Sequence, residues 1–238
     1  MRVDEETKNL INTHSISSLA RRYDRCLLLE SIIIKGKLKH NDFNFPEKSE
    51  WYFLQQFPTF YYFENAQTTQ STDLAIGQIQ QSRDKSYLEI QQDCSCLYFV
   101  ETPNIDTGYR KELKYNVSNL MKMIYVGIKR RKITQIPEKI GIYVFFSKVS
   151  ESKILKGEIK EATHKYLTVL INGTTPFQPK FAVKKEELYW AKNNLDSFMA
   201  KLDFKTFFWE DLIASIENDQ TRAEINAFYE KCKNNDKQ

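Results

Sequence analysis

The expected fold is decided by three apolar segments, Thr72-Asp-Leu-Ala-Ile-Gly77, Tyr87-Leu-Glu-Ile-Gln91 and Leu97-Tyr-Phe-Val-Glu-Thr-Pro103. Each is short, rich in aliphatic or aromatic residues and bounded by polar residues, which is typical of β-strands. The polar connections at 80–85 and 93–96 are short enough for hairpins. Consecutive strands joined this closely predict an antiparallel meander.

A long amphipathic helix is predicted after these strands, from Tyr109 to about Lys132. At about 100° per residue, its apolar side chains fall within one third of the helix circumference: Leu113, Val117, Leu120, Met121, Ile124 and Ile128. Lys111, Lys114, Lys122 and Lys129 lie on the opposite side. We therefore expect the apolar side to cover the sheet and the lysines to face outward.

The segment Ile140-Gly-Ile-Tyr-Val-Phe-Phe146 is a nearly continuous apolar run. Such a run is expected for a strand that is buried on both faces. A strand–helix–strand unit over 97–146 normally forms a parallel crossover. Together with the antiparallel meander, this unit predicts a mixed sheet.

The fold class expected for the whole chain is α/β, with a mixed central sheet flanked by helices. Further helices are predicted at residues 13–34, 47–56, 188–202 and 209–216 and from a capping box at Thr221–Glu224, and further strands at 59–63 and 166–171. We expect residues 1–182 to form the α/β core with its N-terminal helices. Residues 183–238 are expected to form a helical C-terminal segment packed on that core.

The composition is that of a globular protein: 41% of the 238 residues are hydrophobic and 28% are charged. The formal net charge of +4 is close to neutral for this length, so binding to a polyanion would depend on local clusters of charge. With seven glycines and no phosphate-binding glycine loop, nucleotide-fold enzymes are disfavoured.

The cysteines and the N-terminal sequence indicate an intracellular protein. Four cysteines are too few for a disulfide scaffold, and the three histidines lack zinc-ligand spacing, so reduced cysteines are favoured over a zinc site. The first residues are charged, and the longest apolar runs are about five residues, which predicts neither a signal peptide nor a membrane span. We expect a cytoplasmic protein, or a nuclear one in a eukaryote.

Acidic residues occur at the ends of the predicted strands. Asp73 begins one strand, and Glu89 and Glu101 lie on the two strands that follow. With these acids, the order helix, three-strand meander, helix, strand resembles the PD-(D/E)XK nuclease superfamily over about residues 45–147. The resemblance implies a restriction-endonuclease-like core. It also implies an acid at the start of the second strand and a Glu-x-Lys motif on the third.

In that resemblance Asp73 is the first acid, and either Glu89-Ile-Gln91 or Glu101-Thr-Pro103 is the second element. The two carboxylates would hold one Mg²⁺, whose bound water attacks a phosphodiester. The lysine of the motif is absent from both candidates. Gln91 could still position water, whereas Pro103 could not, so catalysis through Glu101 would recruit another residue, such as Lys111 or Lys114.

Two further features belong to the resemblance or compete with it. Glu50 or Glu47, on the helix predicted before the meander, would be an auxiliary acid. The competing interpretation is that Asp73, Glu89 and Glu101 are ordinary solvated acids at strand ends. A third interpretation is a degraded nuclease that keeps the fold and binds without cutting.

The densest basic cluster is Lys129-Arg-Arg-Lys132, with Lys111, Lys114 and Lys122 upstream. Four consecutive cations could contact phosphates in a salt-sensitive manner without selecting a sequence. The same residues could instead complement the dipole at the C-terminus of a helix, or form a nuclear targeting signal.

The sequence therefore predicts a Mg²⁺-dependent nucleic-acid phosphodiesterase, a hydrolase of the endonuclease type. DNA is the expected nucleic acid. The alternative is a non-catalytic nucleic-acid-binding or scaffolding subunit of a larger complex. The nuclease hypothesis requires Asp73 to lie beside Glu89 or Glu101.

Overall fold

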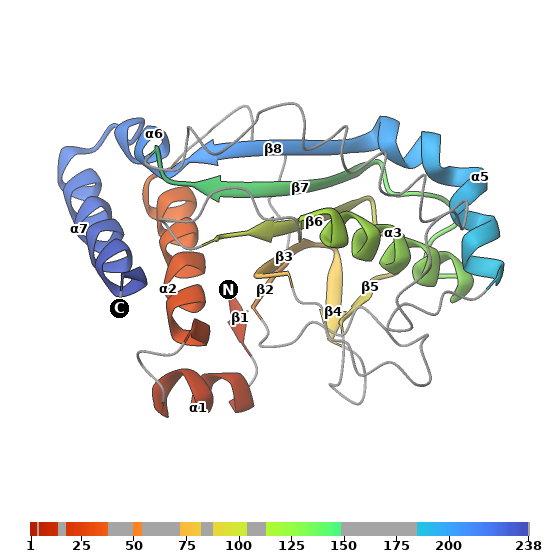
Figure 1. Ribbon diagram of the computed structural model, residues 1–238, viewed down its shortest axis with the longest axis horizontal. Helices are drawn as coiled ribbons and strands as arrows, with labels where there is room; N and C mark the ends of the chain where they lie inside the picture. The colour runs from red at the N-terminus through yellow and green to blue at the C-terminus, as the bar shows by residue number, and fades with distance from the viewer. Residues whose placement is uncertain are drawn as a thin grey trace.

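A computed structural model describes residues 1–3, 5–13, 18–37, 50–53, 72–81, 88–103, 113–148 and 185–237. Within these residues a six-stranded mixed sheet crosses the molecule (Figure 1). Its strands in spatial order are β1 (Arg2–Val3), β2 (Glu50–Phe53), β3 (Leu74–Gly77), β6 (Cys96–Glu101), β7 (Lys139–Phe146) and β8 (Leu202–Phe208). A separate hairpin consists of β4 (Ile79–Gln81) and β5 (Leu88–Ile90).

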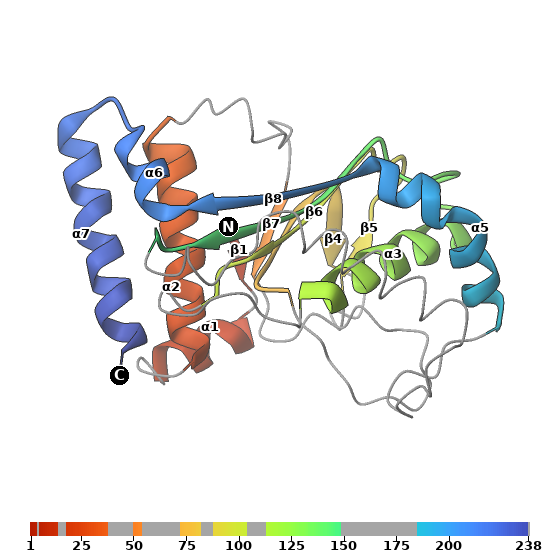
Figure 2. The same ribbon diagram turned by 45° about the horizontal axis from the view of Figure 1, so that its top comes forward.

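Helices cover both faces of the sheet. They are α1 (Glu5–Thr13), α2 (Ser18–Glu30) with its π-helical extension η1 (Ser31–Lys35), α3 (Leu113–Lys129), α5 (Lys185–Lys201), α6 (Trp209–Ala214) and α7 (Asp219–Asp236). Helices α2, α6 and α7 gather at one end of the long strands, whereas α3 and α5 lie toward the other end (Figures 1 and 2). None of the described helices has the length and apolar character needed to cross a membrane.

Alternate side chains of β6 enter two separate cores. Leu97 and Phe99 pack with residues of α3 and α5, whereas Tyr98 and Val100 pack with residues of α2, α6 and α7. Because both faces are covered, the strand is apolar along nearly its whole length. The same holds for β7, seven of whose eight residues are buried.

The predicted fold class is confirmed. β6 pairs in parallel with β7 across the α3 connection, and β7 pairs in parallel with β8, while β3 pairs with β2 and β6 in antiparallel directions. The helix predicted at 109–132 is α3, and the strand predicted at 140–146 is β7. The strands predicted at 59–63 and 166–171 lie outside the described residues.

The helix predicted before the meander and the meander itself differ in the structure. The helix predicted at 47–56 is wrong, because residues 50–53 form β2, paired with both β1 and β3. The consecutive aromatics Trp51, Tyr52 and Phe53 suit a strand whose side chains enter cores on both faces. The predicted meander also differs, because β5 pairs with β4 in the hairpin and not with the central sheet.

The chain leaves the central sheet at Gly77. This residue has φ of 150°, and a Cβ here would overlap the carbonyl oxygen of Cys96 on the neighbouring strand. Only glycine tolerates both constraints. The chain therefore forms the β4–β5 hairpin and then returns as β6 to pair with β3.

The C-terminal segment contains a strand that the sequence pattern did not predict. Residues 202–208 form β8, which extends the central sheet beside β7, while the helices predicted around it are α5, α6 and α7. The predicted capping box at Thr221 is also wrong. Helix α7 begins at Asp219, and the side chain of Asn218 caps it by accepting a hydrogen bond from the backbone N–H of Thr221, 2.8 Å away.

Replacing Gly141 with Ala should destabilise the protein by about 1–3 kcal/mol, as overpacking of a core does. A Cβ at this position would lie 2.5 Å from Cδ1 of Tyr98 and 2.7 Å from the carbonyl oxygen of Asp203. The Tyr98 ring cannot easily retreat, because it packs against the ring of Tyr143 at 5.0 Å between centroids. Chemical denaturation measures the change in unfolding free energy.

The matched control is Gly127→Ala in α3. There the added Cβ would meet the ends of the Ile90 and Ile133 side chains at 3.1–3.3 Å, and alanine favours the helix. We expect a change smaller than about 1 kcal/mol. Equal stability of the Gly141 variant and the wild type would contradict the packing described here.

Candidate functional site

Pairing of β3 with β6 brings Asp73 and Glu101 together. Leu74 lies opposite Val100 in the antiparallel register, so the residue before Leu74 and the residue after Val100 meet at the end of the ladder. The two carboxyl groups also interact electrostatically: burial is the largest cause of the raised pKa of Glu101, and the negative charge of Asp73 raises it further. The first acid predicted from the sequence thus lies beside one of its two predicted partners.

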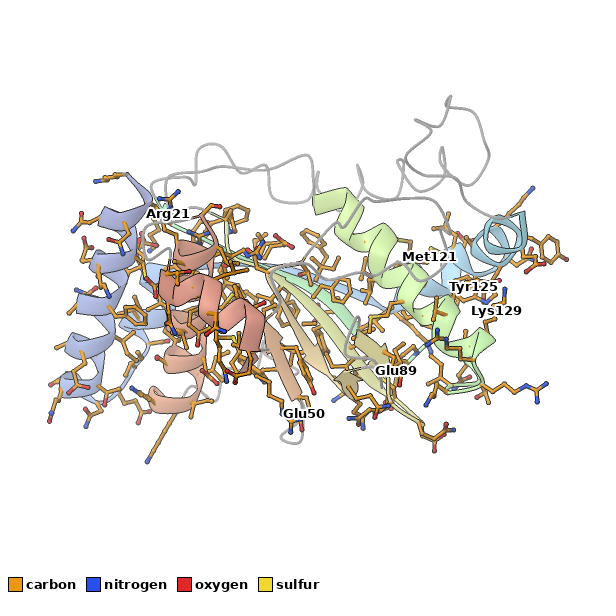
Figure 3. All side chains as sticks on the ribbon, turned by 90° about the horizontal axis from the view of Figure 1, so that it is seen from below. Arg21, Glu50, Glu89, Met121, Tyr125 and Lys129 are labelled. Atoms are coloured by element: carbon orange, nitrogen blue, oxygen red, sulfur yellow. The ribbon has the colours of Figure 1, made fainter. Side chains whose placement is uncertain are left out.

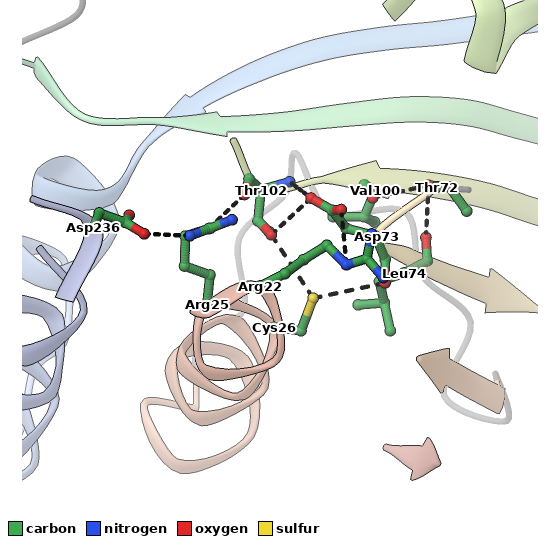
Figure 4. Close-up of polar contacts among 9 residues, drawn as sticks. All are labelled: Arg22, Arg25, Cys26, Thr72, Asp73, Leu74, Val100, Thr102 and Asp236. Atoms are coloured by element: carbon green, nitrogen blue, oxygen red, sulfur yellow. Dashed lines mark hydrogen bonds and ion pairs between the residues drawn. The ribbon is translucent and has the colours of Figure 1, made fainter. Parts of the chain in front are cut away.

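Asp73 is held from two sides, and only 7% of its surface is exposed. Its Oδ2 accepts hydrogen bonds from the backbone N–H of Thr102 at 2.8 Å and from the Thr102 hydroxyl at 3.0 Å. Its Oδ1 lies 3.4 Å from Nε of Arg22, on α2 (Figure 4). The Arg22 guanidinium also stacks over the ring of Phe53, 5.3 Å from the centroid. The position of the carboxylate is therefore fixed.

The pKa of Glu101 is raised well above its usual value. Burial is the largest cause, and the negative charge of Asp73 is the second. Hydrogen bonds from the Thr72 side chain and the Asp73 backbone oppose the shift, as does the charge of Arg22, without reversing it. The two carboxyl groups thus lie in one partly buried site, in which a second negative charge is unfavourable.

A second layer of polar residues surrounds Asp73 (Figure 4). Nε of Arg25 donates to the carbonyl oxygen of Thr102 at 2.6 Å, and Nη1 of Arg25 binds Oδ1 of Asp236 at 2.6 Å. The thiol of Cys26 lies 3.8 Å from the Thr102 hydroxyl. No sequence motif marked Arg22, Arg25 or Asp236 as site residues. One signal was present, because Arg25 lies three and four residues before the buried Leu28 and Leu29, on the side of the helix that faces the core.

Glu89 lies in the β4–β5 hairpin, away from Asp73. Its Oε1 accepts from the Gln80 side chain at 2.9 Å, and its Oε2 pairs with Nη1 of Arg130 at 3.2 Å. Figure 3 shows Glu89 near the end of α3 that carries Lys129. Asp73 precedes the first residue of β3, whereas the hairpin follows the last, so a strand about 13 Å long separates them.

The other residues expected at the site are also placed elsewhere. Gln91 belongs to the hairpin, where its side-chain amide donates to the carbonyl oxygen of Ile79 at 2.9 Å. Glu50 lies on β2, and its carboxylate pairs with Arg2 at 2.8 Å. Lys111 and Glu47 lie outside the described residues, as does the side chain of Lys114. The structure therefore brings together only Asp73 and Glu101 among the described acids proposed from the sequence.

The basic segment 129–132 terminates α3. The backbone N–H of Lys132 donates to the carbonyl oxygen of Gly127, and that of Arg131 donates to Ile128, both at 2.9 Å. With φ of 57° at Arg131, this is a Schellman motif that has arginine in the position usually taken by glycine. The segment thus satisfies carbonyl groups at the helix end through its backbone N–H groups. The complementing of the helix dipole by its side-chain charges stays a prediction.

Two cations of this segment already have acidic partners. Lys129 lies 3.4 Å from the carboxylate of Glu186 on α5, and Arg130 pairs with Glu89 on the hairpin. Arg131 is exposed, and Lys132 is partly exposed. The side chain of Lys122, expected upstream in the same cluster, lies outside the described residues.

The donor chemistry of Asp73 and Glu101 fits a Mg²⁺ ion. In the part of the chain that the structure describes, no three His, Cys, Asp or Glu side chains gather as a metal site. Mg²⁺ does not require three, since it commonly takes one or two carboxylates and completes its octahedron with water and substrate phosphate. A divalent cation would also relieve the repulsion that raises the pKa of Glu101.

Comparisons with protein-family models, with curated proteins and with solved structures found no significant match.

Replacing Arg131 with Gly should stabilise the protein by about 0.5–1 kcal/mol, because glycine adopts positive φ without steric strain. Lys132→Gly is the matched control, since φ at this neighbouring residue is not positive and glycine there only adds unfolded-state entropy. Thermal unfolding should show a higher Tm for the first variant and a lower Tm for the second. A lower Tm for Arg131→Gly would contradict the described helix end.

Replacing Glu101 with Gln should stabilise the metal-free protein increasingly as the pH rises. The raised pKa means that the folded protein holds this proton more tightly than the unfolded chain does. The wild type therefore loses stability from about pH 4.5, the usual pKa of the group, up to the higher pKa of the folded state. Glutamine resembles the protonated acid and does not titrate.

Urea unfolding of both proteins in EDTA, at pH 4.5 and pH 8, measures this difference. The two unfolding free energies should be similar at pH 4.5, and the variant should be more stable at pH 8. A difference that is the same at both pH values would contradict the raised pKa of Glu101, and with it the burial of this group beside Asp73.

Proposed function

We propose that the protein is a Mg²⁺-dependent phosphodiesterase that cleaves nucleic acid, of the PD-(D/E)XK type. The observation that carries the proposal is the meeting of Asp73 and Glu101 at the ends of paired strands. The surrounding topology supports it, since β2, β3 and β6 form an antiparallel meander and α3 connects β6 to the parallel strand β7. The order helix, three antiparallel strands, helix, strand is that of the resemblance, although two elements differ from those predicted: α2 stands in place of the helix expected at 47–56, and β2 stands in place of β5 among the antiparallel strands.

Asp73 and Glu101 would hold the cation through carboxylate oxygens. A bound Mg²⁺ lowers the pKa of a coordinated water and neutralises charge that develops on the phosphate. Glu101 loses its proton when the site is filled, so cation binding should strengthen as the pH rises. Thr102 keeps the Asp73 carboxylate in position through its two hydrogen bonds.

Arg22 supplies positive charge beside the acid pair. Pro103 occupies the place of the lysine expected from the resemblance, and Gln91 lies in the hairpin. A guanidinium forms strong hydrogen bonds to phosphate oxygens, and Arg22 is already stacked and oriented at Asp73. We assign to Arg22 the electrostatic role of the absent lysine.

Nucleic acid is the proposed substrate, with DNA as the first to be tested. Arg131 and Lys132 at the end of α3 would contact the phosphate backbone. Lys129 and Arg130 of the same segment form ion pairs with acidic side chains. Arg131 keeps a left-handed conformation in which glycine would be favoured, and strain of this kind is common at functional positions. The location proposed for the protein is the one expected from the sequence, cytoplasmic or, in a eukaryote, nuclear.

A second candidate is a nucleic-acid-binding or scaffolding protein that does not cleave. Two observations favour it: Pro103 follows the acid pair, and the Arg22 guanidinium lies against the carboxylate that would hold the metal. In this case the arginine would replace the metal as the partner of Asp73. Binding would then be independent of Mg²⁺.

The test is cleavage of mixed DNA and RNA substrates with and without Mg²⁺. Asp73→Asn and Glu101→Gln each remove the charge of one proposed ligand while preserving its shape. Each should reduce cleavage by more than the roughly 10–100-fold loss typical of residues that only support a metal ligand. Glu230→Gln, which removes an exposed carboxylate of α7, is the control and should cleave as the wild type does.

Three results would contradict the proposal. Cleavage by the wild type that is unchanged in both site variants would indicate a contaminant or another site. Loss of activity in Glu89→Gln with full activity in Glu101→Gln would move the site to the hairpin. Tight nucleic-acid binding with no cleavage in Mg²⁺ would favour the second candidate.

A further inference from the structure

A buried ion pair connects the last turn of α7 with α2. Nη1 of Arg25 lies 2.6 Å from Oδ1 of Asp236, and their side chains are 4% and 0% exposed. The two residues are 211 positions apart in the sequence. Asp236 is the final residue of α7, so the pair fixes the end of that helix against α2.

Arg25 also holds the backbone of the candidate site. Its Nε donates to the carbonyl oxygen of Thr102 at 2.6 Å, and Thr102 is fully buried. The backbone N–H and hydroxyl of the same threonine donate to Oδ2 of Asp73. One guanidinium therefore fixes the residue that orients Asp73, and that residue directly follows Glu101 in the chain (Figure 4).

Stability alone does not account well for this pair. Burying two charges has a large desolvation cost, and well-packed apolar residues often stabilise a protein as much as a buried ion pair does. The pair does hold Arg25 in one orientation, in which its Nε donates to the carbonyl oxygen of Thr102. Residues behind a metal ligand commonly act in this way, by orienting the ligand and tuning its charge.

We propose that Arg25 is a positioning residue for the acid pair and that Asp236 holds Arg25 in its working orientation. Cation binding at Asp73 and Glu101 and docking of the last turn of α7 are then thermodynamically coupled. This inference rests on the proposed function, because it takes the acid pair as a site for a divalent cation.

The coupling acts in both directions. If loss of the Asp236 contact weakens cation binding by some factor, cation binding strengthens the docking of the α7 end by the same factor. The end of α7 thereby becomes a part of the molecule through which the occupancy of the site can be controlled.

The first experiment titrates the full chain with Mn²⁺ in a calorimeter, using Asp236→Asn and Arg25→Lys. Asp236→Asn removes the charge that holds Arg25. Arg25→Lys keeps a charge opposite Asp236 but loses the planar fork that also reaches Thr102. Each variant should bind Mn²⁺ about 10–100-fold more weakly than the wild type. Glu230→Gln, an exposed carboxylate of the same helix, is the matched control and should leave the affinity unchanged.

The second experiment measures hydrogen exchange of the amides at residues 230–237 with and without Mg²⁺. In the wild type, Mg²⁺ should slow their exchange, and this effect should be lost in Arg25→Lys and in Asp73→Asn. A merely structural ion pair would leave the exchange insensitive to Mg²⁺.

Each outcome decides between the proposals. Wild-type affinity for Mn²⁺ in folded Asp236→Asn and Arg25→Lys would overturn the positioning role and leave the proposed function intact. Absence of Mn²⁺ binding by the wild type would overturn both. If Asp236→Asn does not fold, Arg25→Lys and the exchange measurement on the wild type decide the question.

Discussion

The antiparallel pairing of β3 with β6 fixes the position of the candidate site within the sheet. Its register places Asp73 opposite Glu101, and a slip of one residue would move every side chain of one strand to the other face of the sheet. Because apolar side chains on both faces enter separate cores, such a slip is strongly disfavoured. The packing of the whole domain thus holds the two carboxyl groups together, although the burial of each carboxyl group is itself unfavourable.

The sequence predicts the central part of this fold because periodicity and burial agree there. The apolar side of α3 and the nearly continuous apolar run of β7 follow directly from two-sided covering of the sheet. In β2 and β8 local pattern and tertiary pairing disagree. Trp51 falls at a spacing that also suits a helix, and Asp203 and Lys205 interrupt β8, yet both segments pair along a neighbouring strand. Strand pairing overrode the local signal in both places.

The candidate site was predictable in part. Asp73 is marked by its place at the start of a strand, but the choice between Glu89 and Glu101 depends on which later strand pairs with β3. Gly77 determines that choice by turning the chain out of the sheet, and strand patterns alone do not reveal its φ. Arg25 and Asp236 meet across 211 residues, and no local pattern encodes such a contact. Only the position of Arg25 on the buried side of α2 indicated that it has a partner.

Whether Asp73 and Glu101 together hold a divalent cation can be seen in a crystal of the protein grown with Mn²⁺. An anomalous difference map should show one peak between the two carboxylates, at roughly 2.0–2.3 Å from an oxygen of each. Arg22 should then have moved away from Oδ1 of Asp73. A map without a peak at this position, with Arg22 still against Asp73, would show that the two carboxylates do not form a cation site.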